Sequence, residues 1–152
     1  FAGKLGIRNI YCIKDINSVD KYNLIFMKDV LEHFNKEEIL VLLEKIYKAL
    51  KNGGFLIIQI PNAESPFSGR IRYGDFTHEV SFTKSSISQA LLVSRFKNIN
   101  IYSQQPVIHG LKSLIRFVIW ELIGFGLRFY LLVETGSGKG IFSQNIIATA
   151  KK

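Results

Sequence analysis

The chain has 152 residues, of which 20 are Lys or Arg and 12 are Asp or Glu, giving a formal charge of +8. This length fits one domain with a substantial core. The basic residues are dispersed and no aromatic residues interleave with a basic cluster, so the composition argues against nucleic-acid binding. The single Cys12 excludes an internal disulfide and a cysteine metal cluster. It fits a reducing compartment, so we expect a cytoplasmic protein.

The first half of the chain has the pattern of two strands and a helix. A short strand is expected at 9–13, and a buried one at 22–28, where nearly continuous apolar residues are typical of a parallel strand. Asn35 and Glu38 match a capping box and predict the start of a helix, which Gly53 is expected to end. The apolar residues that recur at helical spacing along it are Ile39, Leu42, Leu43, Ile46 and Leu50.

The second half continues the alternation. A buried strand at 55–60 stops at Pro61, which lacks the N–H that a central strand needs. The polar loop at 62–82 is longer than a connection requires, so we expect it to have a function. The remaining expected elements are a helix at 83–96, which Thr83 caps, and strands at 97–104 and 144–150.

This alternation of strands and helices predicts a doubly wound α/β sheet, because parallel neighbours need a crossover connection. Ligands of such sheets bind outside the carboxyl ends of the strands. The residues at these ends are Asp15 and Ile16, then Lys28 to His33, then Asn62 and the loop beyond it. A binding site is therefore expected where these three segments meet.

Five motifs occur in a fixed order: DVLEHF at 29–34, LKNGGFLII at 50–58, PN at 61–62, YGDFTHE at 73–79 and SFT at 81–83. Together they resemble the ubiquinone-biosynthesis-type branch of class I S-adenosylmethionine (SAM)-dependent methyltransferases, with a narrower likeness to bacterial members. The resemblance implies a Rossmann-like, mostly parallel sheet with helices on both faces and an antiparallel last strand. The first strands and their glycine-rich motif have no counterpart here. The expectation is an N-terminally truncated fragment, with 1–152 as the C-terminal part of one methyltransferase domain.

The resemblance also implies SAM as the cofactor. Asp15 and Ile16 match the pair that contacts the adenine, through a carboxylate and an apolar side chain. Lys28, Asp29 and Val30 match the end of the central strand, whose backbone passes close to the methionine portion. Without the glycine-rich turn, the N–H groups that hold the cofactor's carboxylate are not supplied. We therefore expect this chain alone to bind SAM poorly or not at all, and to be inactive.

Methyl transfer from a sulfonium is an in-line displacement with an excellent leaving group, so alignment supplies most of the acceleration. A base helps if the acceptor is a hydroxyl, and a histidine that titrates near neutral pH suits that role. His33 and His78 are the catalytic candidates. For His33 a second interpretation stays open, in which Glu32 and His33 only cap and orient the following helix. For His78 the alternative is an ordinary polar loop residue.

The acceptor-side candidates are Asn62, Arg70, Tyr73 and Glu79. Arg70, Arg72 and Tyr73 either receive an anionic acceptor or form a solvated face of the loop. Asp75 and Glu79 flank His78, but one histidine with two carboxylates is a weak ligand set. We therefore predict no metal site.

A hydrophobic helical insertion is expected at about 107–133. Its charged residues, Lys112, Arg116, Glu121 and Arg128, leave no apolar run long enough to span a bilayer. One face of its helical wheel carries Leu111, Leu114, Val118, Leu122, Phe125 and Phe129. Three interpretations stay open: a lid over the active-site mouth or a helix packed on the sheet, a homodimer contact, and a helix peripheral to a membrane.

The predicted function is SAM-dependent methyl transfer to a small-molecule or saccharide-linked acceptor, most simply at oxygen, in the intact parent protein. The rival is a non-catalytic domain that keeps the half-sheet and uses 107–133 to attach to a membrane or a partner.

Overall fold

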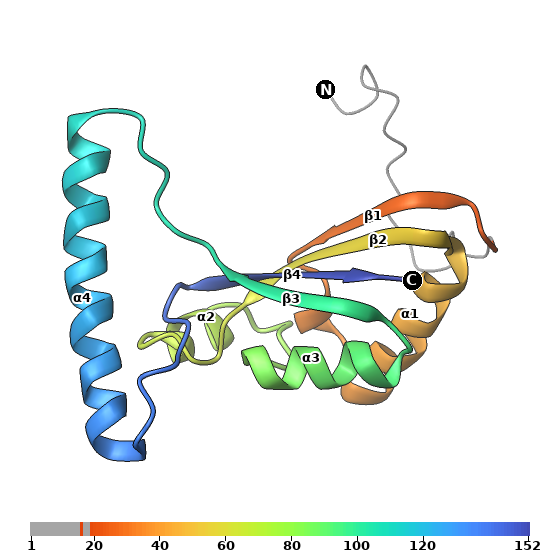
Figure 1. Ribbon diagram of the computed structural model, residues 1–152. Helices are drawn as coiled ribbons and strands as arrows, with labels where there is room; N and C mark the ends of the chain where they lie inside the picture. Colours follow the sequence, from red (N-terminus) through yellow and green to blue (C-terminus); the bar gives the residue numbers. More distant parts are fainter. Residues whose placement is uncertain (1–15, 17–18) are drawn as a thin grey trace.

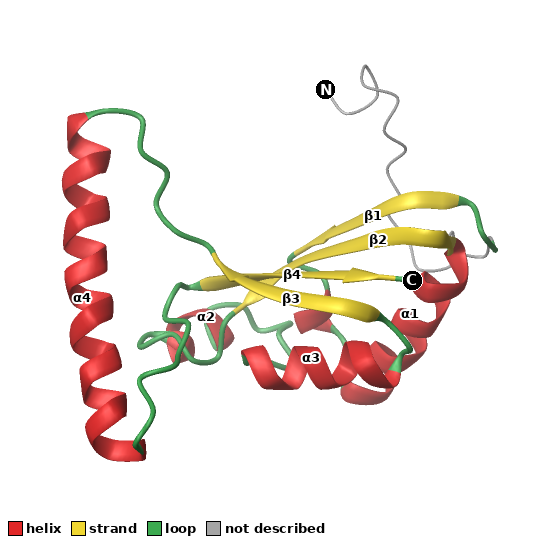
Figure 2. Cartoon of the chain, viewed as in Figure 1, coloured by secondary structure: helices red, strands yellow, loops and turns green. Residues whose placement is uncertain are grey.

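The computed structural model describes residue 16 and residues 19–152. The described elements in chain order are β1 (Tyr22–Lys28), the 3-10 turn η3 (Leu31–His33), α1 (Lys36–Ala49), β2 (Leu50–Pro61), α2 (Ser68–Arg72), α3 (Lys84–Val93), β3 (Lys97–Ser103), α4 (Leu111–Thr135) and β4 (Asn145–Lys151). Figures 1 and 2 show them as one twisted sheet with helices beneath it and α4 standing apart. The strand expected at 9–13 lies outside the described residues.

The four described strands form one sheet in the order β1-β2-β4-β3. β1 and β2 are parallel neighbours, with Lys28 opposite Gln59 near their carboxyl ends. β4 runs antiparallel to both β2 and β3, between which it lies. The predicted parallel pair joined by a helix, and the antiparallel last strand, are therefore confirmed. The tips of β1 and β2 stand side by side, which the site prediction requires.

Helix α1 begins as its sequence predicts. The Asn35 side chain accepts a hydrogen bond from the Glu38 N–H (2.9 Å), and the Glu38 carboxylate accepts one from the Asn35 N–H (3.1 Å). These two bonds satisfy N–H groups that have no partner within the helix. The predicted inner face is buried throughout: Ile39, Leu42, Leu43, Ile46 and Leu50.

The predicted end of this helix is wrong. α1 stops at Ala49, and the residues up to Gly54 already belong to β2. Gly53 has a φ of +78°, so the glycine bends the start of the strand instead of ending the helix. A Cβ at Gly54 would lie 2.8 Å from the Lys51 carbonyl oxygen, so this bend has no room for a side chain.

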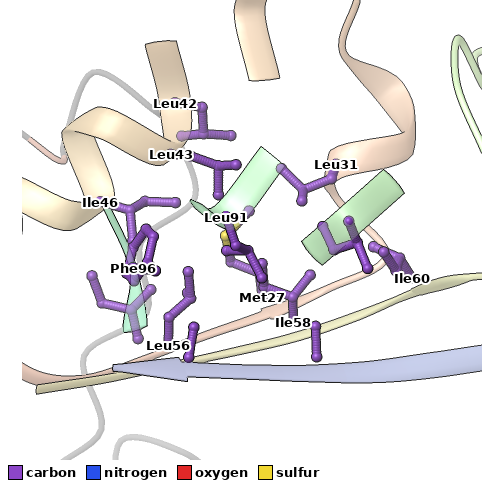
Figure 3. Packing of buried hydrophobic residues seen from close by; sticks show 14 of the residues in the cluster. Met27, Leu31, Leu42, Leu43, Ile46, Leu56, Ile58, Ile60, Leu91 and Phe96 are labelled. Carbon is purple, nitrogen blue, oxygen red and sulfur yellow. The ribbon is translucent and has the colours of Figure 1, made fainter. Parts of the chain in front are cut away.

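The core lies between one face of the sheet and helices α1 and α3. Figure 3 shows the strand residues Met27, Leu56 and Ile58 packed against residues from the helix side of the core. These residues are Leu43, Ile46, Leu91 and Phe96. Helix α3 is fixed at its start by Thr83, whose side chain accepts from the Ser86 N–H (3.1 Å), while Ser86 Oγ accepts from the Thr83 N–H (2.9 Å). Burial of this continuous apolar cluster is the main term that stabilises the fold.

The opposite face of the sheet is different. Among the described residues, α1 and α3 cover one face only, whereas the resemblance implied helices on both. Leu24, Phe26 and Phe55 lie on the other face and are each more than half exposed. Their alternation with buried Ile25, Met27 and Leu56 follows from the two-residue period of a strand.

Helix α4 does not pack on the sheet. Figure 1 shows it at the end of the molecule away from α1, attached by the segments 104–110 and 136–144. Leu111, Val118, Leu122, Phe125 and Phe129, from the predicted apolar face, are all exposed. Of the three interpretations of this segment, the structure contradicts a helix packed on the sheet. None of the described helices is both long and apolar enough to cross a bilayer.

Candidate active site

The site begins where β1 ends. Asp29 follows the strand with a φ of +52°, and its N–H donates to the Gln59 carbonyl of β2 (3.0 Å). Lys28 and Asp29 are exposed at this tip, while Val30 is half-buried and packs against the core. The left-handed Asp29 turns the chain sharply, so that the next residues cross the end of the sheet.

The turn η3 that follows joins two distant segments. The Glu32 carbonyl accepts hydrogen bonds from the N–H groups of Glu79 (2.7 Å) and Val80 (3.2 Å). These bonds hold the loop at 73–80 against the carboxyl end of β1. They also bring the His33 and His78 rings together edge to face, with their centroids 4.8 Å apart. The two catalytic candidates are therefore neighbours in one site.

A chain of polar groups orients His33. The Thr77 hydroxyl donates to Asp75 Oδ1 (2.7 Å), which also accepts from the Thr77 N–H (2.9 Å). These hydrogen bonds lower the pKa of the Asp75 carboxyl, so the group is an ionised acceptor near neutral pH. Thr77 Oγ1 lies 2.9 Å from His33 Nδ1. Since the hydroxyl proton goes to Asp75, His33 Nδ1 is the donor in this contact, so in the neutral ring Nε2 is the acceptor.

His78 is held in the same tautomer by a different partner. Its Nδ1 lies 3.1 Å from the Ile71 carbonyl oxygen, which can only accept, so Nδ1 carries the proton. The Arg72 guanidinium donates to the backbone carbonyls of both His78 and Glu79. Arg72 thus shapes the loop, and the neutral form of each histidine has its acceptor at Nε2.

Glu32 is the residue that sequence reasoning missed. Its side chain is 1% exposed, and neither carboxylate oxygen has a hydrogen-bond partner among the described residues. Burial raises the pKa of the Glu32 carboxyl, and the nearby Asp29 carboxylate raises it further. The only sequence signal was its place between the apolar Leu31 and the polar His33, directly after a buried strand. A buried, unpaired acid beside two histidines is typical of a functional site.

One premise behind the prediction of no metal site does not hold. It counted a single histidine, but His33 and His78 are neighbours, and one ligand atom from each lies within 4.8 Å of the other and of a Glu32 oxygen. Imidazole and carboxylate groups are common ligands of transition metals. The three side chains could therefore hold either a shared proton or a cation.

The remaining predicted residues that the structure describes lie outside this cluster. Asp15 lies outside the described residues, and Ile16 is half-buried against the core. Arg70 and Tyr73 are exposed on the loop. Glu79 is exposed and contributes its backbone to the contacts with Glu32 and Arg72.

The Asn62 side chain forms its hydrogen bonds within the protein and not with a ligand. Its amide is 1% exposed and donates to the carbonyls of Ile141 (2.6 Å) and Ser143 (2.8 Å). Its carbonyl oxygen accepts from the Glu64 N–H (3.0 Å). The side chain thus ties the end of β2 to the segment that leads into β4.

No protein-family model and no curated protein matches the sequence. The fold does match solved structures. A SAM-dependent methyltransferase from Archaeoglobus fulgidus is similar with a TM-score of 0.65 and 20% identity, over 96% of this chain and 67% of that one. A SAM-dependent methyltransferase from Thermotoga maritima gives 0.63 and 13%, over 99% and 66%. Phosphoethanolamine N-methyltransferase 2 from Haemonchus contortus, in complex with SAM, gives 0.52 and 13%, over 89% and 34%. The chain has a Rossmann-like methyltransferase fold.

Proposed function

We propose that the chain is part of a SAM-dependent methyltransferase, of the ubiquinone-biosynthesis type, that methylates a hydroxyl of a small-molecule or saccharide-linked acceptor in the cytoplasm. The observation that carries the proposal is the cluster at the carboxyl ends of β1 and β2. There a methyltransferase fold presents His33 with Nδ1 held as a donor and Nε2 free to accept. Sites of doubly wound sheets lie at this edge.

The exposed tip of β1 fits one side of a cofactor site. Within the described part of the chain, the Asp29 carboxylate accepts one side-chain hydrogen bond, of 3.5 Å from Gln59, so it is available to a ligand. Lys28 and Val30 flank it on the same turn, and Ile16 packs against the core. We infer that Ile16 and these three residues hold part of the cofactor. The bound cofactor would supply an activated methyl group on a sulfonium.

The proposed role of His33 is that of general base. As the acceptor's hydroxyl oxygen takes up the methyl group that the cofactor would supply, the hydroxyl proton would move to His33 Nε2. The Asp75–Thr77 pair would stabilise the resulting imidazolium, because Thr77 Oγ1 accepts from His33 Nδ1 and is itself held by the Asp75 carboxylate. His78, whose ring touches that of His33, would limit the orientations open to the acceptor.

Calorimetry with SAM tests the proposal, on this chain and on the longest form that its gene encodes. Micromolar binding by the longer form is expected, and absence of binding by both forms would reject the enzyme in favour of a non-catalytic domain.

A matched pair of histidine variants tests the proposed base. In the longer form, His33→Gln should lower kcat about 10²–10⁴-fold with phenolic or sugar hydroxyl acceptors and leave SAM affinity within about twofold. His109→Gln is the control, because His109 is exposed in the 104–110 segment. Equal losses of kcat and SAM affinity in His33→Gln would reject its role as a base.

A further inference from the structure

The outward face of α4 is apolar along its whole length. The helix turns Phe117, Trp120, Gly124 and Leu127 toward the body, where they are half-buried or buried. On the other side, Leu122 is 67% exposed and Phe125 is 71% exposed. A contiguous apolar surface that runs along a helix of 25 residues is uncommon on a monomer and marks a binding surface.

The spacing of the exposed residues points to another helix as the partner. They recur in alternating steps of four and three: Leu111, Ile115, Val118, Leu122, Phe125, Phe129 and Leu132. This is the heptad repeat of a coiled coil, with Ile115, Leu122 and Phe129 at position a and the others at position d. All seven are at least half exposed, so the seam is free to pair.

Side-chain size decides the direction of pairing. In a parallel pair, Phe125 would meet Phe125 and Phe129 would meet Phe129 across the seam. In an antiparallel pair, position a of one helix faces position d of the other. Leu122 then meets the partner's Phe125, and Val118 meets the partner's Phe129. Each large ring faces a smaller side chain, as close packing requires.

The charges beside the seam agree with the antiparallel pair. Glu121 and Arg128 both occupy position g, and g faces g in an antiparallel coiled coil. The register that pairs Leu122 with the partner's Phe125 also brings Glu121 opposite the partner's Arg128. A two-fold axis repeats this ion pair on the other side of the centre. Within the described chain neither residue forms an ion pair, and Glu121 has only a 3.4 Å hydrogen bond from Gln105.

We propose that α4 binds α4 of a second copy of this chain as an antiparallel two-helix coiled coil. The axis passes beside residues 123 and 124. Gly124 leaves room for Arg128, whose Nη1 lies 3.2 Å from the position that a Cβ would take there. Gly126 has open space around it and faces the partner's Ile119, where a small residue lets the backbones approach.

Sedimentation equilibrium at low salt tests the pairing. The 17.3 kDa chain should sediment as a dimer. Leu122→Glu should make it monomeric, while the matched control Ile123→Glu, an exposed change one position outside the seam, should leave the dimer intact. A wild-type monomer at tens of micromolar (~10–50 µM), or a dimer in Leu122→Glu, would overturn the proposal.

A charge swap tests the register. Glu121→Arg and Arg128→Glu should each raise the dimer dissociation constant by roughly tenfold or more, because each puts like charges together twice. The double variant restores opposite charges and should recover dimerisation. Failure of the double variant to recover would overturn the antiparallel register.

Flotation with vesicles of phosphatidylcholine and phosphatidylserine tests whether an anionic membrane, and not a second copy of the chain, covers this face. The dimer should stay with the soluble fraction, because its apolar seams are buried. Flotation of a monomer would assign the face to an anionic membrane instead, and so reject the dimer.

Discussion

Helix α1, which packs under the sheet, and the separate helix α4 both carry apolar residues at helical spacing, but these residues lie in opposite environments. In α1 the residues at helical spacing are buried under the sheet, whereas the α4 residues at the same kind of spacing are exposed. The difference lies in the partner, since β1 and β2 supply α1 with a complementary face and no described element does so for α4. Hydrophobic spacing thus identifies a face to be buried, while the topology decides whether the same chain buries it.

The largest expected effect contrasts one isoleucine from each region. Ile46→Ala should lower the free energy of unfolding by about 2–5 kcal/mol, because Ile46 is fully buried and the change leaves a cavity. Ile123→Ala should change it by only about 0.5 kcal/mol, because that side chain is half exposed. Urea unfolding followed by circular dichroism measures both. Similar losses in the two variants would show that α4 is as well packed as α1.

The next effect concerns the connection between the two regions. Asn62→Ala removes a buried amide that donates to two carbonyls of the segment between α4 and β4. The free energy of unfolding should fall by about 1–3 kcal/mol, the usual cost of unpaired buried polar groups. Gln105→Ala, an exposed residue of the other connection, is the control. Hydrogen exchange of the 141–145 amides should rise in Asn62→Ala alone, and unchanged exchange would contradict this structural role.

The smallest effect depends on pH. Burial raises the pKa of the Glu32 carboxyl above its ordinary 4.5. At neutral pH the charged carboxylate therefore lowers the stability of the folded chain. Glu32→Gln should raise the free energy of unfolding by about 1 kcal/mol at neutral pH. The gain should shrink as the pH falls toward 4.5, where the unfolded chain is protonated as well. Urea midpoints from about pH 4 to pH 8 measure it, with Glu134→Gln as the exposed control. A gain independent of pH would contradict the assigned cause.

The parts of the fold that the sequence predicted are local. The Asn35–Glu38 box and the strands β1 and β2 depend on residues within a few positions of one another, and all three are confirmed. The predicted burial of the whole of β1 is wrong, because Leu24 and Phe26 on its other face are exposed. The end of α1 was wrong because Gly53 suits either a helix cap or a bent strand. Pairing with β1 extends β2 back to Leu50 and decides between these conformations.

The parts of the site that escaped prediction are long-range. His33 and Thr77 are 44 positions apart, so only the folded loop shows that one orients the other. The burial of Glu32 likewise depends on the 73–80 loop closing over η3. A helical wheel groups five of the seven exposed seam residues of α4 but does not say which way the face points. The direction in which this face points depends on how α4 is attached to the sheet.

The position of β1 at one edge of the described sheet has a practical consequence for producing the protein. Its outer backbone N–H and C=O groups, next to the exposed Leu24 and Phe26, can hydrogen-bond to an extended segment of any other chain. Lys21 and Lys28 at the two ends of the strand oppose the addition of β1 from a second copy, because that strand would bring like charges together. High salt screens that repulsion, so concentrated samples should be kept at low ionic strength to avoid aggregation that does not involve α4.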